Sequence, residues 1–172
     1  EQINDMDHLV QYQLKRAMLG QQGLRQQQTK VAPIAQQVAQ MLDKIYRDKH
    51  VIFTLQVSAS LHLPLSKGDV MELLGNLMEN AFRLCSNKVQ VTAQHLDGNM
   101  IQLSVEDDGP GVDDAIKQKI IQRGMRADTQ SSGQGIGLAV CHEIVSSYGG
   151  TMTITTSELG GAAFVIQLSA TT

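Results

Sequence analysis

Apolar residues recur at helical intervals in five segments of the chain. Residues 1–19 carry apolar side chains three and four positions apart, and so do residues 31–48. The segments at 67–85 and 136–150 are more strongly apolar, and the second stops at a glycine pair, as helix C-termini commonly do. A shorter amphipathic segment occupies residues 113–125. We expect a helix in each of these five segments.

Between the helical segments, apolar and polar residues alternate as they do in strands. Residues 51–57 alternate in this way, and residues 61–65 fit a short edge strand because they include a proline. Two hairpins follow, one over residues 88–108 with an Asp-Gly turn and one over residues 151–170. The order of elements predicts an α+β fold, a two-layer sandwich with a mostly antiparallel sheet.

A polar stretch separates the first helical segment from the rest of the chain. Residues 20–29 contain two glycines and a run of glutamines, which is the composition of a linker or hinge. The pattern therefore predicts two parts, a first segment at residues 1–23 and a domain at residues 24–172. Because the chain begins inside a helical pattern, we expect it to be a fragment of a longer protein.

The composition narrows the possible partners. The 172-residue chain is 42% hydrophobic and 18% charged, which is typical of a globular protein. Its formal net charge of −3 gives no basic stripe, so we expect neither a nucleic acid nor an anionic membrane as partner. The two cysteines, Cys85 and Cys141, fall in apolar helical patterns without metal-ligand spacing, and we expect reduced core thiols. No apolar run in the sequence is long enough to span a membrane.

The first candidate binding motif lies at the end of the first predicted hairpin. The sequence LSVEDDGPGV, residues 103–112, runs into two carboxylates and then into a Gly-Pro-Gly turn. Asp-Gly turns end many strands, so the motif alone is more typical of an ordinary turn. In the functional interpretation, Gly109 and Gly111 allow a flat ligand to approach the backbone, and the carboxylate of Asp107 accepts a hydrogen bond from that ligand.

Two asparagines lie one turn apart in the helix predicted at residues 67–85. Asn76 and Asn80 share a helix face with apolar neighbours, although Asn is a poor helix former and is unfavourable to bury without partners. Either they face solvent, or their amide oxygens point into a cleft where Mg²⁺ could bind them alongside phosphate oxygens. Arg83 follows one turn later, near enough to contact a phosphate.

A glycine-rich loop precedes the last predicted helix. Its sequence, GQGIGLAV at residues 133–140, offers backbone N–H groups and the positive end of a helix dipole to an anion. Such loops also occur as flexible connections. The motif is not a dinucleotide-binding fingerprint, because no strand precedes it, and it is not a P-loop, because no Lys-Ser/Thr pair follows.

In this order, three motifs resemble the boxes of a known family. NLMENA, EDDGPG and GQGIGLA are similar to the N, G1 and G2 boxes of the Bergerat (GHKL) ATP-binding domain of histidine kinases, type II topoisomerases, heat-shock chaperones and mismatch-repair ATPases. The resemblance covers roughly residues 30–170 and is greatest to the PhoQ sensor kinases of two-component systems, while residues 1–23 resemble the end of a dimerisation-domain helix. It implies a mixed, mostly antiparallel five-stranded sheet under three helices.

The resemblance also implies ATP and Mg²⁺ as ligands and a role for each matching residue. Asp107 would accept the adenine amino group, and Gly109 and Gly111 would lie beside the base and ribose. The other implied roles are metal ligation by Asn76, Asn80 and Gln134, phosphate contact and catalysis by Arg83 and Arg126, and phosphate contact by the backbone N–H groups of Gly135, Gly137 and Leu138.

The chain departs from the family pattern in four places. The phenylalanine-containing box before the lid reads IIQRGM, residues 130–132 lack the second basic residue of the lid, and Leu84 replaces an aromatic residue. No phosphoacceptor histidine with an acidic neighbour is present, and His8 lies in the wrong helix for that role. We therefore expect that the chain cannot phosphorylate itself and transfers only to an acceptor domain supplied separately.

Asn76 separates the branches of the family by chemistry. Hydrolytic members have a glutamate there as general base for water, and an asparagine cannot take that proton. The expected function is transfer of the γ-phosphoryl group of Mg-ATP to a histidine of a dimerisation domain. The resemblance places this domain on the cytoplasmic side of a homodimeric inner-membrane sensor that acts on a response regulator. Two alternatives remain: a stand-alone serine kinase of anti-sigma type, and a nucleotide-binding or dimerisation module without transfer activity.

Overall fold

A five-stranded mixed sheet forms the centre of the computed structural model, which describes residues 27–123 and 134–170. The strand order is β2–β4–β5–β7–β6, and every neighbouring pair is antiparallel except the parallel pair β2–β4. The strands are β2 (Ile52–Val57), β4 (Lys88–Leu96), β5 (Met100–Asp107), β6 (Thr151–Thr156) and β7 (Ala162–Ser169).

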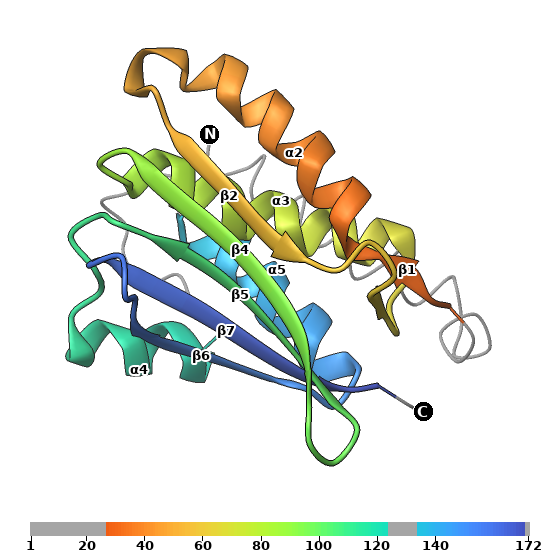
Figure 1. The fold of residues 1–172 in the computed structure, drawn as a ribbon. Helices are drawn as coiled ribbons and strands as arrows, with labels where there is room; N and C mark the ends of the chain where they lie inside the picture. Colours follow the sequence, from red (N-terminus) through yellow and green to blue (C-terminus); the bar gives the residue numbers. More distant parts are fainter. Residues whose placement is uncertain (1–26, 124–133, 171–172) are drawn as a thin grey trace.

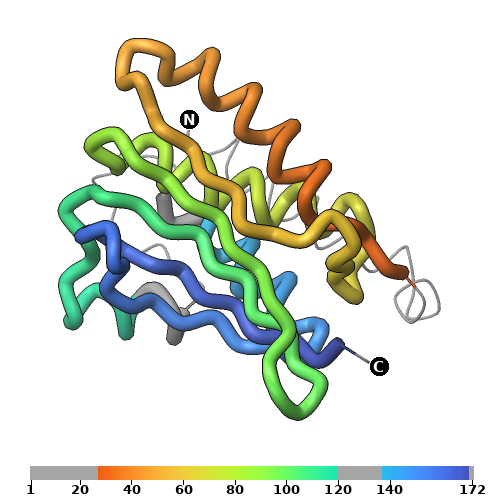
Figure 2. Tube along the Cα trace, viewed as in Figure 1, coloured from red at the N-terminus to blue at the C-terminus, as the bar shows by residue number. Residues whose placement is uncertain are grey.

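Three helices cover one face of this sheet: α2 (Val31–Ile45), α3 (Lys67–Leu84) and α5 (Gln134–Ser147) (Figure 1). A fourth helix, α4 (Asp114–Arg123), lies beside the edge strand β6 and also contacts α5. The tube in Figure 2 shows α3 and α5 behind the sheet, between α2 and α4. The predicted α+β two-layer sandwich with a mixed five-stranded sheet is therefore confirmed.

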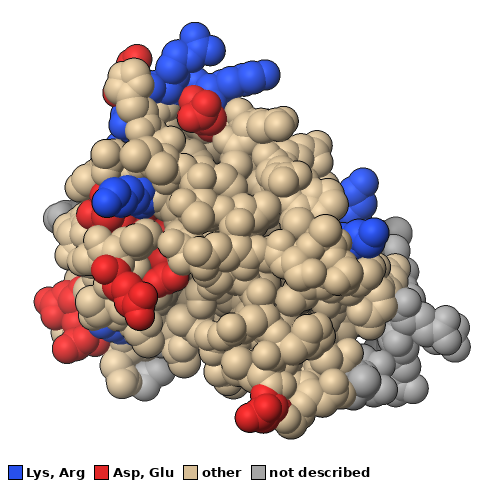
Figure 3. Space-filling model, in the orientation of Figure 1, with Lys and Arg blue, Asp and Glu red and all other residues tan. Residues whose placement is uncertain are grey.

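The period-two pattern of the strands places the core between the sheet and the helices. On β5, Ile101, Leu103 and Val105 are buried and alternate with more polar residues. They meet the apolar face of α3, whose Leu73 and Leu77 are fully buried. Figure 3 shows the other face of the sheet, which is mostly uncharged, with the visible acidic side chains gathered mainly on one side.

The helix α3 carries three of the predicted site residues, and both of its ends have identifiable partners. At its start, the hydroxyl of the N-cap residue Ser66 accepts a hydrogen bond from the Asp69 N–H (3.0 Å). At its end, the backbone becomes extended at Cys85, and the ammonium group of Lys49 donates to the carbonyl oxygens of Phe82 (2.8 Å) and Arg83 (2.7 Å). The helix is therefore held at both termini.

Two details differ from the predicted elements. The helix expected at residues 31–48 ends at Ile45, and a 3₁₀ turn over Arg47–Lys49 follows, before His50 adopts the left-handed conformation (φ +52°). The short strand β3 (His62–Leu63) does not join the main sheet. It pairs antiparallel with β1 (Thr29–Lys30) as a separate two-stranded sheet.

The helix predicted at residues 1–19 and the boundary predicted between residues 23 and 24 lie outside the described residues, and both stay predictions. Within residues 27–123 and 134–170, no helix combines the length and the apolar character that crossing a membrane requires. Both cysteines are buried free thiols, as predicted.

Candidate functional site

The candidate site is built around the end of β5. Asp107 is only 1% exposed and lies on the same face of the strand as Val105. Its Oδ1 accepts hydrogen bonds from the backbone N–H groups of Gly109 (2.8 Å) and Ala162 (3.4 Å). Its Oδ2 is buried and has no hydrogen-bond partner among the described residues. Burial raises the pKa of this carboxyl, and a ligand that donates a hydrogen bond would satisfy the remaining acceptor.

The glycines around Asp107 are required by the packing of the protein itself. A Cβ at Gly109 would collide with the carbonyl oxygen of Leu84, at the end of α3. A Cβ at Gly161, in the turn between β6 and β7, would lie 2.5 Å from the Gly109 nitrogen and 2.6 Å from the Asp107 carbonyl oxygen. Gly111 has φ +78°, a conformation that favours glycine. Besides its predicted role beside a ligand, Gly109 therefore allows the turn to pack against the end of α3.

The neighbouring carboxylate, Asp108, ties this turn to the loop after α3. Its Oδ1 accepts hydrogen bonds from the backbone N–H groups of Ser86 (2.9 Å), Asn87 (3.1 Å) and Lys88 (3.0 Å). Burial on its own would raise the pKa of Asp108, but these N–H groups outweigh it and hold the pKa below its usual value. Asp108 therefore fixes the turn in place.

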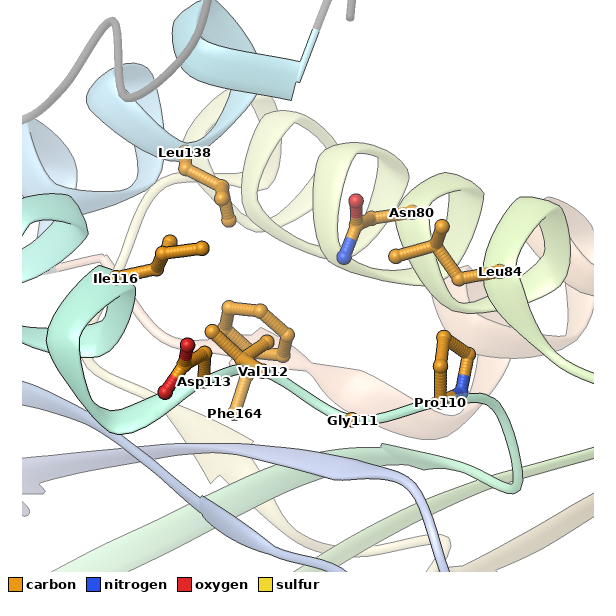
Figure 4. Close-up of a pocket in the computed structure, with 9 residues that line it drawn as sticks. All are labelled: Asn80, Leu84, Pro110, Gly111, Val112, Asp113, Ile116, Leu138 and Phe164. Atoms are coloured by element: carbon orange, nitrogen blue, oxygen red, sulfur yellow. The ribbon is translucent and has the colours of Figure 1, made fainter.

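A pocket of about 190 Å³ opens next to the turn, between α3, α4, α5 and β7 (Figure 4). Most of its lining is apolar, with the Asn80 amide and the Asp113 carboxylate as polar groups, which is a lining that suits a flat ring with polar substituents. The lining residues are Asn80, Leu84, Pro110, Gly111, Val112, Asp113, Ile116, Leu138 and Phe164.

The two asparagines of α3 have different environments. Asn80 is 5% exposed and lines the pocket, and its Oδ1 accepts a hydrogen bond from Arg83 Nη2 (2.9 Å). Asn76 is half-buried, and its Nδ2 donates to the carbonyl oxygen of Glu72 (2.8 Å). An amide oxygen has two acceptor positions, so both asparagines retain the capacity to bind a cation. The described residues contain no cluster of three or more His, Cys, Asp or Glu side chains that could hold a metal.

The start of α5 approaches Asn76. A Cβ at Gly137 would lie 3.0 Å from Asn76 Oδ1, so this glycine lets the first turn of α5 pack closely against α3. The next residue, Leu138, is buried and lines the pocket. The backbone of Gln134 and Gly135 opens α5, whereas the Gln134 side chain and the whole of Arg126 lie outside the described residues.

The structure places three of the predicted residues in the lining of one pocket. These are Asn80, Gly111 and Leu138, and Asp107 and Gly109 lie one to three positions before Pro110, the first lining residue of the turn. Sequence reasoning missed Asp108, Gly161 and Phe164, because their contacts depend on segments far apart in the chain. Asp108 is part of the motif LSVEDDGPGV, but its residue type alone does not show that it accepts hydrogen bonds from the backbone N–H groups of residues 86–88.

The family profile described as "Histidine kinase-, DNA gyrase B-, and HSP90-like ATPase" matches residues 66–172, which includes α3, β5 and α5. The chain belongs to this ATPase family. The "Two-component sensor PhoQ" of Pseudomonas aeruginosa is 47% identical over 168 residues, covering 98% of this chain and 37% of that protein. The chain spans about a third of the length of the curated relatives it matches, which are named as PhoQ sensors.

Solved histidine kinase structures share the fold of this ATPase domain. The catalytic domain of histidine kinase ThkA superposes with a TM-score of 0.73 at 21% identity, covering 84% of this chain and 95% of that one. Full-length ShkA in complex with AMPPNP superposes with a TM-score of 0.67 at 26% identity, covering 83% of this chain and 30% of that one. The predicted kinship with histidine kinases, and with PhoQ sensors among them, is confirmed, and the chain carries an ATP-binding domain of the histidine kinase type.

Proposed function

We propose that this domain binds Mg-ATP and supplies its γ-phosphoryl group to a histidine on the dimerisation domain of a two-component sensor kinase. The observation that carries the proposal is the buried Asp107 carboxylate, whose Oδ2 has no partner among the described residues. An adenine amino group is a donor of the right kind for that oxygen. The apolar pocket beside the turn would receive the ring.

The phosphates of ATP would lie toward α3 and the start of α5. Mg²⁺, when bound, neutralises charge on the phosphate oxygens, and Asn76, Asn80 and Gln134 are the proposed ligands. The close approach of Gly137 to Asn76 supports an arrangement in which α3 and α5 both lie beside the phosphates. The remaining proposed phosphate contacts are the side chains of Arg83 and Arg126 and the backbone N–H groups of Gly135, Gly137 and Leu138.

The neutral side chain of Asn76 favours transfer over hydrolysis. An amide cannot take a proton from water, so Asn76 does not supply the general base that a glutamate provides at this position in hydrolytic members of the family. An imidazole is itself a good nucleophile: its nitrogen forms the bond to the γ-phosphorus, the bond to the β–γ bridging oxygen breaks, and ADP leaves while the imidazole releases its N–H proton. Positioning and charge stabilisation are then the main tasks of the protein.

The proposal extends to the partners of the whole kinase. One relative is named as a two-component sensor and others as sensor histidine kinases, which supports a response regulator as the downstream partner and a dimerisation domain as the phosphoryl acceptor. Residues 1–23 are proposed to be the end of a dimerisation-domain helix, with residues 24–172 as the catalytic domain. We place the domain on the cytoplasmic side of a homodimeric inner-membrane sensor.

Two measurements on the full chain test this function. Calorimetric titration with ATP, with and without Mg²⁺, is expected to show Mg²⁺-dependent binding. Incubation with radiolabelled ATP is expected to leave the chain itself unlabelled and to label a separately supplied acceptor domain of its own full-length kinase in an acid-labile manner, as phosphohistidine requires. Acid-stable label on a serine would favour a serine kinase, and binding without any transfer would leave a nucleotide-binding module.

A further inference from the structure

A series of side-chain contacts connects the end of α2 to the pocket. The hydroxyl group of Tyr46 donates to Glu79 Oε1 (2.6 Å), and the same carboxylate oxygen lies 3.6 Å from Arg83 Nε. The same guanidinium group donates from Nη2 to Asn80 Oδ1 (2.9 Å). Of these four residues, only Asn80 lines the pocket. Tyr46 is thus connected to the pocket through Glu79 and Arg83.

The connection between α2 and β2 also holds the backbone of Arg83. Lys49 donates from Nζ to the carbonyl oxygens of Phe82 and Arg83, and this ammonium group lies 5.8 Å from the centroid of the Tyr46 ring. The Tyr46 ring packs near the buried ring of Phe82, with centroids 6.4 Å apart. One short connection therefore constrains Arg83 at its main chain, through Lys49, and at its side chain, through Tyr46 and Glu79.

These contacts contribute more to the orientation of the Arg83 side chain than to the stability of the fold. The side chains of Arg83 and Glu79 are 31% and 44% exposed, and an ion pair of this kind adds little to folding. An arginine side chain has many rotamers, however, and fixing one of them before a ligand arrives removes an entropic cost of binding. Burial raises the pKa of Tyr46 to about 12, so its hydroxyl remains a donor to Glu79 at neutral pH.

We propose that Tyr46 and Glu79 are positioning residues for the phosphate side of the nucleotide site: they orient the Arg83 guanidinium group and, through it, the Asn80 amide. Nε of Arg83 is directed to Glu79, and Nη2 donates to Asn80, which lines the pocket. The proposal rests on the proposed function, because it takes Arg83 as a phosphate contact and Asn80 as a ligand of the Mg²⁺ that accompanies the phosphates of ATP.

Tyr46→Phe in the full chain tests this role, since it removes the hydroxyl group and keeps the ring beside Phe82. We expect ATP affinity to fall about threefold to tenfold, the loss of one charge-assisted hydrogen bond acting through Arg83. Adenosine has no phosphates, so its affinity, measured by NMR titration, is expected to be unchanged. A general disturbance of the fold would weaken ATP and adenosine alike.

The chain offers a matched control. Tyr148 donates from its hydroxyl to Asp69 Oδ2 (2.7 Å), so it also binds a carboxylate of α3 at nearly the same distance, but at the opposite end of the helix. Tyr148→Phe is expected to bind ATP and adenosine as the parent does. In an Arg83→Ala background, Tyr46→Phe is expected to have no further effect on ATP affinity, because the residue through which it acts is gone.

The possible failures are distinguishable. If the parent chain bound no ATP, the proposed function and the positioning role would both be wrong. If the parent bound ATP but Tyr46→Phe matched the parent, or lost ATP and adenosine to the same extent, only the positioning role would be overturned. The same holds if Tyr46→Phe weakened ATP equally in the presence and in the absence of Arg83.

Discussion

The two sides of the chain at the end of β5 hold adjacent carboxylates in opposite environments. On the inner side, Asp107 is buried, one of its oxygens has no hydrogen-bond partner among the described residues, and burial raises its pKa. On the outer side, Asp108 accepts three backbone N–H groups that hold its pKa low. The first carboxylate is incompletely satisfied by the protein and suits a ligand, whereas the second is satisfied by the protein and supports the turn.

The opposite pKa shifts have opposite consequences for stability. A carboxyl whose pKa is raised on folding favours the folded state at low pH, and this contribution is lost as the pH rises through the raised value. Ionised Asp107 therefore opposes folding at neutral pH. A carboxyl whose pKa is lowered favours the folded state above its unfolded pKa of about 3.9, and this contribution is lost as the pH falls through the lowered value. Asp108 belongs to this second kind.

The largest effect is expected from Gly161→Ala, which would break the inner side. The added Cβ would collide with Asp107 Oδ1 and would approach the Gly109 nitrogen at 2.5 Å. Overpacking against backbone is expected to lower the unfolding free energy by about 3 kcal/mol and to abolish ATP binding. Urea denaturation and calorimetry would measure the two effects.

Gly75→Ala is the control for this substitution. Gly75 lies within α3, and a Cβ there would have nothing within 4 Å. Replacing a glycine by alanine inside a helix is expected to raise the unfolding free energy by about 0.5–1 kcal/mol. Equal effects of the two substitutions would show that the turn is not packed as described.

The next largest effect is expected from Asp107→Asn, which separates ligand binding from stability. The amide oxygen can still accept from Gly109 and Ala162, but an amide nitrogen replaces the second acceptor. ATP affinity is expected to fall about tenfold to a hundredfold, while the unfolding free energy at pH 7 does not fall, because a buried charge is removed. Parallel calorimetry and thermal unfolding would check both, and unchanged ATP affinity would refute the role of Asp107.

The smallest effect is expected from Asp108→Asn, which tests the outer side. The neutral amide oxygen is a weaker acceptor for the N–H groups of residues 86–88, so the unfolding free energy at pH 7 is expected to fall by about 1 kcal/mol. Parent and variant are expected to converge in acid, below the lowered pKa. Urea denaturation at neutral and at acidic pH would measure this difference, and a constant gap at every pH would contradict it.

Most of the fold could be predicted from the sequence, because periodicity reports which face of each element is buried. Val105 and Asp107 share one face of β5 whatever the rest of the chain does, so a carboxylate at the end of a core-facing row was visible in the pattern. The separate pairing of β1 with β3 was not visible, since two-residue strands carry no period.

The chemistry of the site was only partly predictable, because it depends on contacts between distant residues. The type and spacing of Asn76 and Asn80 pointed to two polar side chains among apolar neighbours on one helix face, but the hydrogen bond from Arg83 to Asn80 shows only in the structure. Tyr46 and Glu79 are 33 residues apart, and no motif connects them. Arg126 and the Gln134 side chain lie outside the described residues, and their roles stay predictions.

The contacts of Asp107 also have a consequence for the order in which the domain matures during synthesis. Ala162, which donates to its carboxylate, lies 55 residues later, and Gly161 donates its N–H to the Asp107 carbonyl oxygen (3.1 Å). Phe164, a wall of the pocket, belongs to the same last hairpin. A nascent chain that has emerged only as far as α5 therefore has the Asp107 carboxylate but lacks part of its support. Under the proposed function, the domain can bind a nucleotide only after the final strand has joined the sheet, so nucleotide binding would report completion of the sheet.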